Sequence, residues 1–212
     1  MNQKPKLLLV DDHHLVLEGF RLELEEEFKI VGMLASGIPV LEECRRLEPD
    51  LVLLDLSLPD RGGLEVVMDL QRGAPAVKIL VVTMHADPVL ADAVMEAGAQ
   101  GFVPKDAEVS ELRTAIREVL AGQRYLSPLI NERGYYTQVE LAFGFSQLTP
   151  RQQEIVKLLG EGKSSARIAA ELAVSPNTVT FHRVRIRKVL GIPTEWGLMR
   201  YALLVRMGRH RA

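Results

Sequence analysis

The first 122 residues alternate between short apolar runs and segments with helical spacing, and this alternation restricts the fold more than any other feature. The apolar runs are rich in β-branched residues, and three of them are apolar almost throughout, which is typical of parallel strands covered on both faces. Five such units in succession predict an α/β domain with a doubly wound, five-stranded parallel sheet. We expect strands at residues 6–11, 28–34, 50–56, 77–83 and 101–104, and helices at 14–27, 38–48, 63–72, 88–97 and 108–121.

Polar residues stand at the ends of four of these predicted strands. Asp11 and Asp12 follow the first strand, Asp55 ends the third, Thr83 ends the fourth, and Lys105 follows the fifth. In an open parallel sheet the carboxyl ends of the strands lie at one edge, where ligands bind. We therefore expect these five side chains, which come from four separate segments, to meet at one edge of the sheet.

The stretch KLLLVDDHHLVLEGF places two histidines directly beside two of these aspartates. Asp11, Asp12 and Asp55 would form an oxygen-rich pocket of the kind that Mg²⁺ prefers, together with water and a phosphate oxygen. His13 and His14 would suit zinc or copper better. Because adjacent residues at the start of a helix point in different directions, we interpret both histidines as bystanders there.

Asp55 is the central carboxylate of this group and its natural nucleophile. A carboxylate can attack a phosphoryl group to form an aspartyl-phosphate, and such chemistry depends mainly on positioning and charge neutralisation. Lys105 would contact the phosphoryl oxygens, and the Thr83 hydroxyl would donate a hydrogen bond to them. Taken singly, Asp55 could be a helix cap and Lys105 a surface charge, but the agreement of four strand ends favours a phosphoryl site.

Charge is distributed unevenly along the chain. Residues 1–122 carry 12 basic and 22 acidic residues, a net charge of −10, whereas residues 148–212 carry 12 and 4, a net charge of +8. This asymmetry suggests two domains, the second with a polyanionic partner, although differently charged solvated surfaces would produce the same counts. We assign residues 1–122 to the first domain, 148–212 to the second, and 123–147, where the periodicity lapses, to a linker.

Cysteine content and hydropathy indicate the cellular compartment in which the protein works. Cys44 is the only cysteine, which excludes an internal disulfide and suits a reducing environment. No apolar run approaches the about 20 residues that span a bilayer, and the first residues lack a signal-peptide core. We therefore predict a cytoplasmic protein without a membrane partner.

Residues 148–212 carry the start and stop signals of short helices. LTPRQQEIVKLLGEG offers Thr149 as N-cap, Pro150 at the first helical position and Gln152 to complete a capping box. SSARIAAELA is a second helix, VSPNTVTFHRVRIRKVLG a third between the cap Ser175 and the stop Gly191, and TEWGLMRYALLVRM a fourth. The tight turn before the third helix predicts an all-α helix-turn-helix domain.

The third helix, residues 176–190, is the predicted recognition helix because it is basic and contains no acid. The N-terminal part of such a helix enters the major groove, where basic side chains suit phosphates and guanine edges. Val179, Ile186 and Val189 are expected to form its buried stripe, and His182 could pack internally instead of contacting a phosphate. The predicted DNA contacts are Thr178, Thr180, His182, Arg183, Val184, Arg185, Arg187 and Lys188.

These motifs resemble a known family. The acidic pair, Asp55 followed by LSLPDRGG, Thr83 and GFVPKD resemble the flavodoxin-like receiver domain of two-component response regulators. The segments LTPRQQEIVKLL and IAAELAVSPNTVTFHRVRIRKVLG resemble a LuxR-type helix-turn-helix. Together they indicate the NarL/FixJ class of response regulator, over nearly the whole chain outside the linker. Thr180 departs from that pattern, because relatives often have lysine there, and so does Arg167, where relatives are frequently acidic.

The resemblance implies that a sensor histidine kinase phosphorylates Asp55 and so controls sequence-specific binding to promoter DNA. Thr83 would move toward the phosphoryl group and Phe102 would turn inward behind it, as a switch pair, although Phe102 could also simply pack in the core. Phosphorylation would favour a homodimer or free the DNA-binding face. The implied Mg²⁺ ligands are Asp11, Asp12, Asp55 and the backbone carbonyl of Ser57.

Two other functions fit parts of the pattern. Haloacid-dehalogenase-like phosphatases use an aspartate nucleophile and magnesium, but they need a second carboxylate two residues later, where this chain has Ser57. A phosphate-independent DNA-binding regulator with a structural receiver is disfavoured by the complete set of strand-end residues. We therefore predict a transcription regulator rather than an enzyme, with at most self-phosphorylation from small donors and slow self-dephosphorylation.

Overall fold

The computed structural model describes residues 4–84, 87–130, 144–192 and 194–208. The chain divides into two compact units, Met1–Asn131 and Glu132–Ala212. Within the described ranges, no helix has both the length and the apolar character to cross a membrane.

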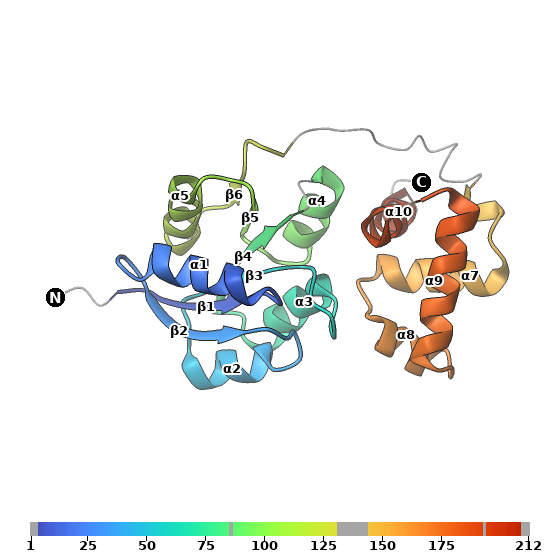
Figure 1. Cartoon of the computed structure of the whole chain (residues 1–212), viewed down its shortest axis with the longest axis horizontal. Coiled ribbons are helices and arrows are strands. Elements are labelled where there is room, and N and C mark those ends of the chain that lie inside the picture. The colour runs from blue at the N-terminus through green and yellow to red at the C-terminus, as the bar shows by residue number, and fades with distance from the viewer. Residues whose placement is uncertain (1–3, 85–86, 131–143, 193, 209–212) are drawn as a thin grey trace. The chain divides into compact units, whose positions relative to one another are not determined.

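The first unit is built on one parallel sheet whose strand order is β2-β1-β3-β4-β5-β6 (Figure 1). Each strand pairs in parallel with its neighbour. The central strands are buried on both faces, as their continuous apolar sequences predicted. The strands are β1 (Lys6–Val10), β2 (Lys29–Leu34), β3 (Leu51–Leu54), β4 (Lys78–Thr83), β5 (Gly101–Pro104) and β6 (Tyr125–Leu126).

Five helices cover this sheet, which confirms the predicted α/β class (Figure 1). The first and last helices pack against alternate residues of β1 and β3, such as Leu7 and Leu51. The last helix contributes Ile116 to this core. Of the remaining three helices, the second of the unit contacts the third, and the third contacts the fourth. They are α1 (His14–Leu24), α2 (Val40–Leu47), α3 (Gly63–Gly73), α4 (Pro88–Glu96) and α5 (Val109–Leu120).

The sheet has six strands rather than the predicted five. Strand β6 lies within the segment 123–147 that was assigned to a linker. Two backbone hydrogen bonds fix it, because Tyr125 N donates to Gln100 O at 2.9 Å and Ser127 N donates to Phe102 O at 3.0 Å. A two-residue strand is too short to show an alternating pattern, so only pairing with β5 reveals it.

The second unit is helical, as predicted, with α7 (Pro150–Gly160), α8 (Ser165–Glu171), α9 (Pro176–Leu190) and α10 (Glu195–Gly208). The predicted caps are confirmed: Thr149 and Gln152 form a reciprocal capping box, and Ser175 accepts a hydrogen bond from Thr178 N. Gly191 ends α9 with a φ of 67°, a left-handed conformation that favours glycine. Local chemistry therefore sets most of these helix boundaries.

The predicted buried stripe of α9 is correct at two positions and wrong at the third. Val179 and Ile186 are fully buried, but Val189 is 49% exposed. Val189 stands three residues after Ile186, which turns it about 60° away from the buried face of a regular helix. The stripe therefore does not continue into the last turn.

Two glycines of the first unit provide a test of its packing. A Cβ at Gly63 would lie 2.4 Å from the backbone Cα of Leu56, which no side-chain rotation can relieve. Gly19, within α1, has nothing within 4 Å of its Cβ position. We expect Gly63→Ala to destabilise the unit by about 1–3 kcal/mol. We expect Gly19→Ala to stabilise it by up to about 1 kcal/mol through helix propensity. Calorimetric melting of the full chain measures both, and shifts of the same sign would contradict this packing.

Candidate functional site

Backbone hydrogen bonds place the strand-end residues at one edge of the sheet. Asp11 N donates to Leu34 O at 3.0 Å, and Asp55 N donates to Val10 O at 2.8 Å. These bonds extend the parallel ladders one residue beyond β1 and β3. The two strands are neighbours where the strand order reverses, so both aspartates lie at the point where open α/β sheets bind ligands.

Lys105 connects these two aspartates. Its backbone N–H donates to Thr83 O at 2.7 Å, which aligns the end of β5 with the end of β4. The ammonium Nζ then lies 2.8 Å from Asp55 Oδ2 and 2.5 Å from Asp11 Oδ2. The three side chains are 5%, 1% and 3% exposed, so the ammonium neutralises two carboxylates that water barely reaches. The predicted convergence of the first, third and fifth strand ends is present in the structure.

The environment of Lys105 determines its protonation state. Burial lowers the pKa of the ammonium, but hydrogen bonds and attraction from Asp11 and Asp55 outweigh it, so the pKa of Lys105 lies above its ordinary value. Lys105 is therefore a permanent cation at neutral pH. One positive charge faces three nearby carboxylates, since Asp12 lies in the same group, so the pocket keeps an excess of negative charge.

Several carboxylate oxygens of the pocket have spare accepting capacity. Asp55 Oδ1 is buried and accepts no hydrogen bond from the described residues. Asp11 Oδ2 and Asp12 Oδ1 are also buried without aligned hydrogen bonds, although Lys105 and His13 form ion-pair contacts with them. Buried anionic oxygens without donors are costly unless a cation joins them. The donor set of Asp11, Asp12 and Asp55 therefore fits a divalent cation of the hard, oxygen-preferring kind.

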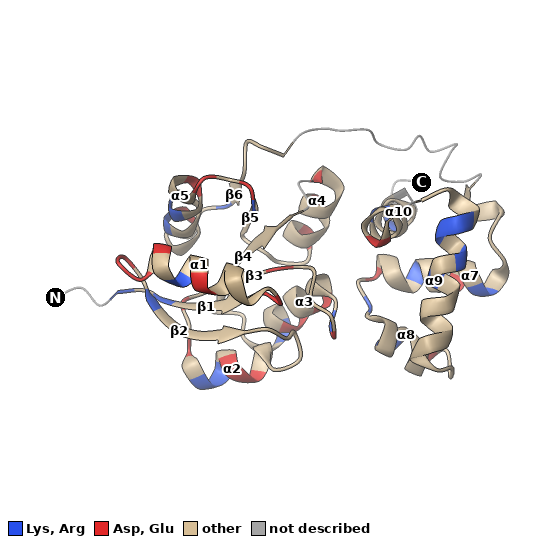
Figure 2. Ribbon diagram, viewed as in Figure 1, with Lys and Arg blue, Asp and Glu red and all other residues tan. Residues whose placement is uncertain are grey.

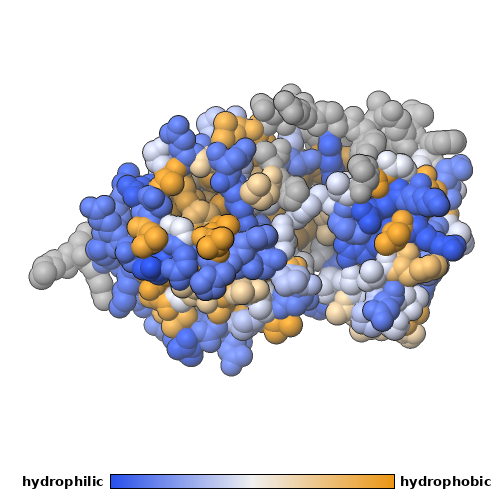
Figure 3. Space-filling view, viewed as in Figure 1, coloured by the Kyte–Doolittle hydropathy of each residue, from blue (hydrophilic) through white to orange (hydrophobic). Residues whose placement is uncertain are grey.

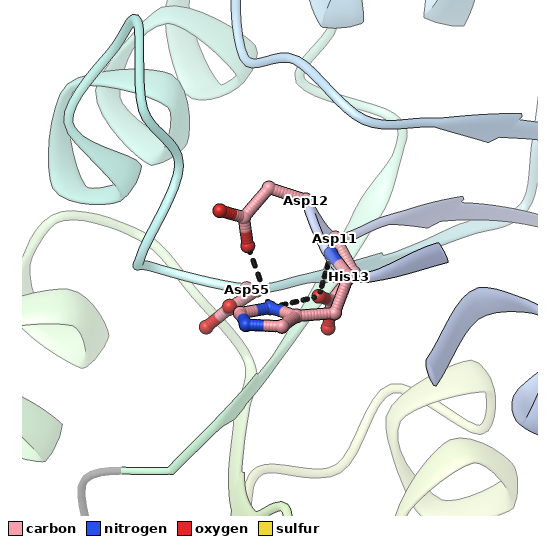
Figure 4. A group of neighbouring side chains, drawn as sticks. All are labelled: Asp11, Asp12, His13 and Asp55. Atoms are coloured by element: carbon pink, nitrogen blue, oxygen red, sulfur yellow. Dashed lines mark hydrogen bonds and ion pairs between the residues drawn. The ribbon is translucent and has the colours of Figure 1, made fainter. Parts of the chain in front are cut away.

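His13 belongs to this group, contrary to the interpretation of both histidines as bystanders. Its Nδ1 lies 2.8 Å from Asp12 Oδ1 and 3.2 Å from Asp11 Oδ1, and Figure 4 shows the ring lying between these two carboxylates and beside Asp55. The His13 backbone N–H donates to Asp11 Oδ1 at 2.9 Å, and this turn directs the ring back toward the pocket. His14, which is exposed and begins α1, fits the bystander interpretation.

Three further predicted residues lie on β4, on β5 and in the loop that follows β3. Ser57 stands two residues after Asp55, half-buried in the loop before α3. Thr83 ends β4 and is fully buried. Phe102 is fully buried in β5, where it pairs with Val81.

The predicted DNA contacts lie along α9, and their exposure differs. Thr180, Val184, Arg185 and Lys188 are exposed, whereas Thr178, His182, Arg183 and Arg187 are half-buried. No acidic residue interrupts the helix, as Figure 2 shows. Arg167, on α8, is also exposed. Of the predicted DNA contacts, the exposed residues are the most accessible to a polyanion.

Arg183 and Arg187 have a common partner within the unit. Arg183 Nη2 and Nε donate to Glu195 Oε2 at 2.7 and 3.0 Å, and Arg187 Nε lies 3.2 Å from Glu195 Oε1. Arg183 Nη1 also donates to Ser165 Oγ at 2.5 Å. The Arg183 guanidinium therefore ties α9 to α8 and α10, so part of the positive charge on α9 is neutralised internally.

Phe181 is a surface residue that the sequence patterns did not single out. It is 53% exposed on α9, and the Arg185 guanidinium lies 4.7 Å from the centre of its ring, within the range of a cation–π contact. Apolar side chains appear at the surface of both units in Figure 3. On α9 the large apolar residues that are exposed are Phe181, Val184 and Val189. The Phe–Arg spacing of four residues within a predicted helix was the signal that could have identified this pair.

Comparison with known proteins agrees with this arrangement. The response regulator receiver domain matches residues 7–117, and the luxR family of bacterial regulatory proteins matches residues 146–202. The chain is 36% identical over 202 residues to the response regulator UvrY of Escherichia coli (strain K12), covering 93% of both proteins. It is 35% identical over 195 residues to the response regulator GacA of Pseudomonas aeruginosa, covering 90% of this chain and 91% of that protein.

Solved structures show the same architecture. A LuxR-family two-component response regulator from Aurantimonas sp. SI85-9A1 has a TM-score of 0.58 and 37% identity, covering 60% of this chain and 93% of that one. RcsB from Salmonella enterica serovar Typhimurium, solved bound to promoter P1flhDC with the phosphomimetic BeF3-, has a TM-score of 0.61, covering 94% and 98%. Its identity of 24% supports a shared fold alone.

An α/β unit with an acidic pocket, followed by a LuxR-type helix-turn-helix unit, defines a transcription regulator with a receiver domain. The chain belongs to the two-component response regulators of the NarL/FixJ class.

Replacing Lys105 by methionine tests the buried ion pairs. Asp11 and Asp55 would face each other without a counter-ion, and breaking a buried pair costs about 3–5 kcal/mol. The raised pKa of Lys105 means that its stabilising effect is complete below the pKa of the unfolded chain, about 10.4, and is lost as pH rises through the higher folded pKa. We expect the melting temperatures of wild type and Lys105→Met to differ by a constant amount from about pH 6 to 9 and to converge at higher pH.

The exposed Lys29 supplies the matched control. Lys29→Met removes the same charge from a solvated position, so we expect little change in melting temperature. Equal effects of the two substitutions would contradict a buried Lys105 network.

Proposed function

We propose that Asp55 accepts a phosphoryl group from a phosphohistidine of a sensor histidine kinase, and that this controls binding of the second unit to promoter DNA. The observation that carries the proposal is the buried contact of Lys105 with both Asp11 and Asp55, beside an Asp55 oxygen that has no donor among the residues the structure describes. The chemistry requires a nucleophilic carboxylate, a fixed cation and room for a metal ion, and one pocket supplies all three.

Each residue of the pocket has a distinct role in this transfer. A carboxylate oxygen of Asp55 forms the new bond to phosphorus while the phosphorus–nitrogen bond of the donor breaks, and the electron pair leaves with the imidazole. Lys105 neutralises Asp55 before the transfer and the phosphoryl oxygens after it. Mg²⁺, when bound, would shield charge on the transferred group; its ligands would be Asp11, Asp12, Asp55 and the carbonyl of Ser57.

Thr83 and Phe102 would communicate the change to the rest of the first unit. Both are fully buried on adjacent strands, so a movement of one must be accommodated by the packing around the other. The Thr83 hydroxyl would donate to a phosphoryl oxygen, and the inward position of Phe102 would be favoured with it. This two-state rearrangement would alter a surface of the unit, favouring a homodimer or releasing the DNA-binding face.

In the second unit, α9 would enter the major groove of duplex DNA. Exposed Arg185 and Lys188, and an acid-free helix, support this placement. Thr180 and Val184 offer methyl groups to base edges. Arg183 would act through its bonds to Glu195 and Ser165, holding α9 in place. RcsB has been solved with DNA, with two dimers on two parallel DNAs in one structure, and a dimer is the geometry that we propose here.

Incubation with acetyl phosphate and Mg²⁺, followed by intact mass measurement, tests the phosphoryl step. We expect wild type to gain one phosphoryl group and Asp55→Asn to gain none, because an amide oxygen is too weak a nucleophile. Asp106→Asn, which alters an exposed carboxylate next to Lys105, should behave as wild type. Modification of the Asp55→Asn protein, or none of wild type, would refute the role of Asp55. Sedimentation of the same samples reports whether the phosphorylated form dimerises.

Salt-dependent DNA binding tests the role of α9. Arg185→Ala should weaken binding by about 1–3 kcal/mol and reduce the slope of log affinity against log salt by about one. Lys157→Ala removes the same charge from an exposed position on α7 and should change affinity much less. Equal losses from both substitutions would mean that only net charge matters, and that α9 is not the recognition helix.

A further inference from the structure

The imidazole of His13 stands over the acidic pocket as a fourth donor, and the proposed phosphoryl transfer does not use it. One of its ring nitrogens and one carboxylate oxygen from each of Asp11, Asp12 and Asp55 all lie within 4.8 Å of one another. The His13 side chain is 63% exposed and that of Asp55 is 1% exposed, so the group extends from solvent to the interior.

We propose that His13 is a metal ligand, so that the pocket binds divalent cations that prefer a nitrogen donor, with Zn²⁺ as the probe, as well as Mg²⁺. The proposal rests on the proposed metal site of Asp11, Asp12 and Asp55 and extends it to a second class of ion. The ion would be held by one oxygen from each carboxylate and by His13 Nδ1, and it would compete with Mg²⁺ for Asp55.

Donor spacing supports this assignment. His13 Nδ1 is 2.8 Å from Asp12 Oδ1 and 3.2 Å from Asp11 Oδ1. Ligand bonds of about 2.1 Å around one ion place neighbouring donors about 3.0 Å apart in octahedral geometry and about 3.4 Å apart in the tetrahedral geometry of zinc. The distance to Asp11 lies between these two spacings, and the distance to Asp12 is slightly shorter than both. The buried Asp55 Oδ1, without a donor among the described residues, supplies a separate indication that the pocket admits a cation.

Charge and ligand chemistry agree with the spacing. Three carboxylates and the Lys105 ammonium leave an excess of two negative charges, which a divalent ion neutralises. Lys105 contacts Asp11 Oδ2 and Asp55 Oδ2, which leaves Asp11 Oδ1 and Asp55 Oδ1 for an ion and fixes both carboxylates in orientation. An imidazole contributes little to binding Mg²⁺ but favours zinc, nickel and copper, so His13 selects between ion classes.

The test is calorimetric titration of the full chain with Zn²⁺ and, separately, with Mg²⁺. We expect His13→Gln to weaken Zn²⁺ binding at least about tenfold and Mg²⁺ binding less than about threefold, because it removes the nitrogen ligand while leaving the carboxylates. His14→Gln, one residue further on and exposed, is the matched control and should leave both affinities unchanged. Asp55→Asn should weaken binding of both ions, which places the zinc at this pocket.

Two results would overturn the proposal. One is a ratio of Zn²⁺ to Mg²⁺ affinity that is the same in His13→Gln as in wild type. The other is zinc binding that is insensitive to both His13→Gln and Asp55→Asn, which would place the ion elsewhere. Because His13 is exposed, we expect His13→Gln to fold; should it not, His13→Ala is measured in its place. Mg²⁺-dependent phosphorylation by acetyl phosphate is measured separately. If the protein is still phosphorylated but His13→Gln leaves the ratio of Zn²⁺ to Mg²⁺ affinity unchanged, only the role of His13 is refuted.

Discussion

The Lys105 ammonium between Asp11 and Asp55 is the interaction on which the first unit's chemistry depends. One cation contacts both carboxylates, whose side chains are only 3% and 1% exposed, and so offsets the cost of burying them together. The backbone bond from Lys105 N to Thr83 O holds that cation at the end of β5, so the sheet itself sets the distance. A shift of one strand by one residue would turn its end side chain to the other face and separate the charges.

Lys105 stabilises this pocket but does not compensate all of its negative charge. Lys105 compensates one charge, but three carboxylates meet there, and Asp55 Oδ1 lies buried without a donor among the described residues. Buried anionic oxygens without donors are costly unless a cation joins them, and this set of carboxylates fits a divalent cation. His13 bears on which cation that is, because nitrogen and oxygen donors favour different ions.

The second unit shows why net charge alone is a poor guide to a DNA-binding surface. Residues 148–212 have a net charge of +8, but Glu195 pairs with both Arg183 and Arg187 within the unit. These arginines join α9 to neighbouring helices, and exposed residues such as Arg185 are the ones that we propose to contact phosphates. Arg185 is in turn positioned over the Phe181 ring, which limits its conformations before DNA arrives.

The fold class, most helix boundaries and the meeting of Asp11, Asp55 and Lys105 could be predicted from the sequence, because they follow from local periodicity, capping chemistry and the rule that parallel strands end at one edge. The sequence did not reveal β6, whose two residues are a strand only through pairing with β5. Nor did it show that His13 turns back onto Asp11 and Asp12, that Glu195 binds Arg183, or that Val189 is exposed. The β6 pairing and the Arg183–Glu195 contact join segments that are distant along the chain, and only tertiary packing brings those residues together. The orientation of His13 depends on the local backbone turn that places its ring beside Asp11 and Asp12.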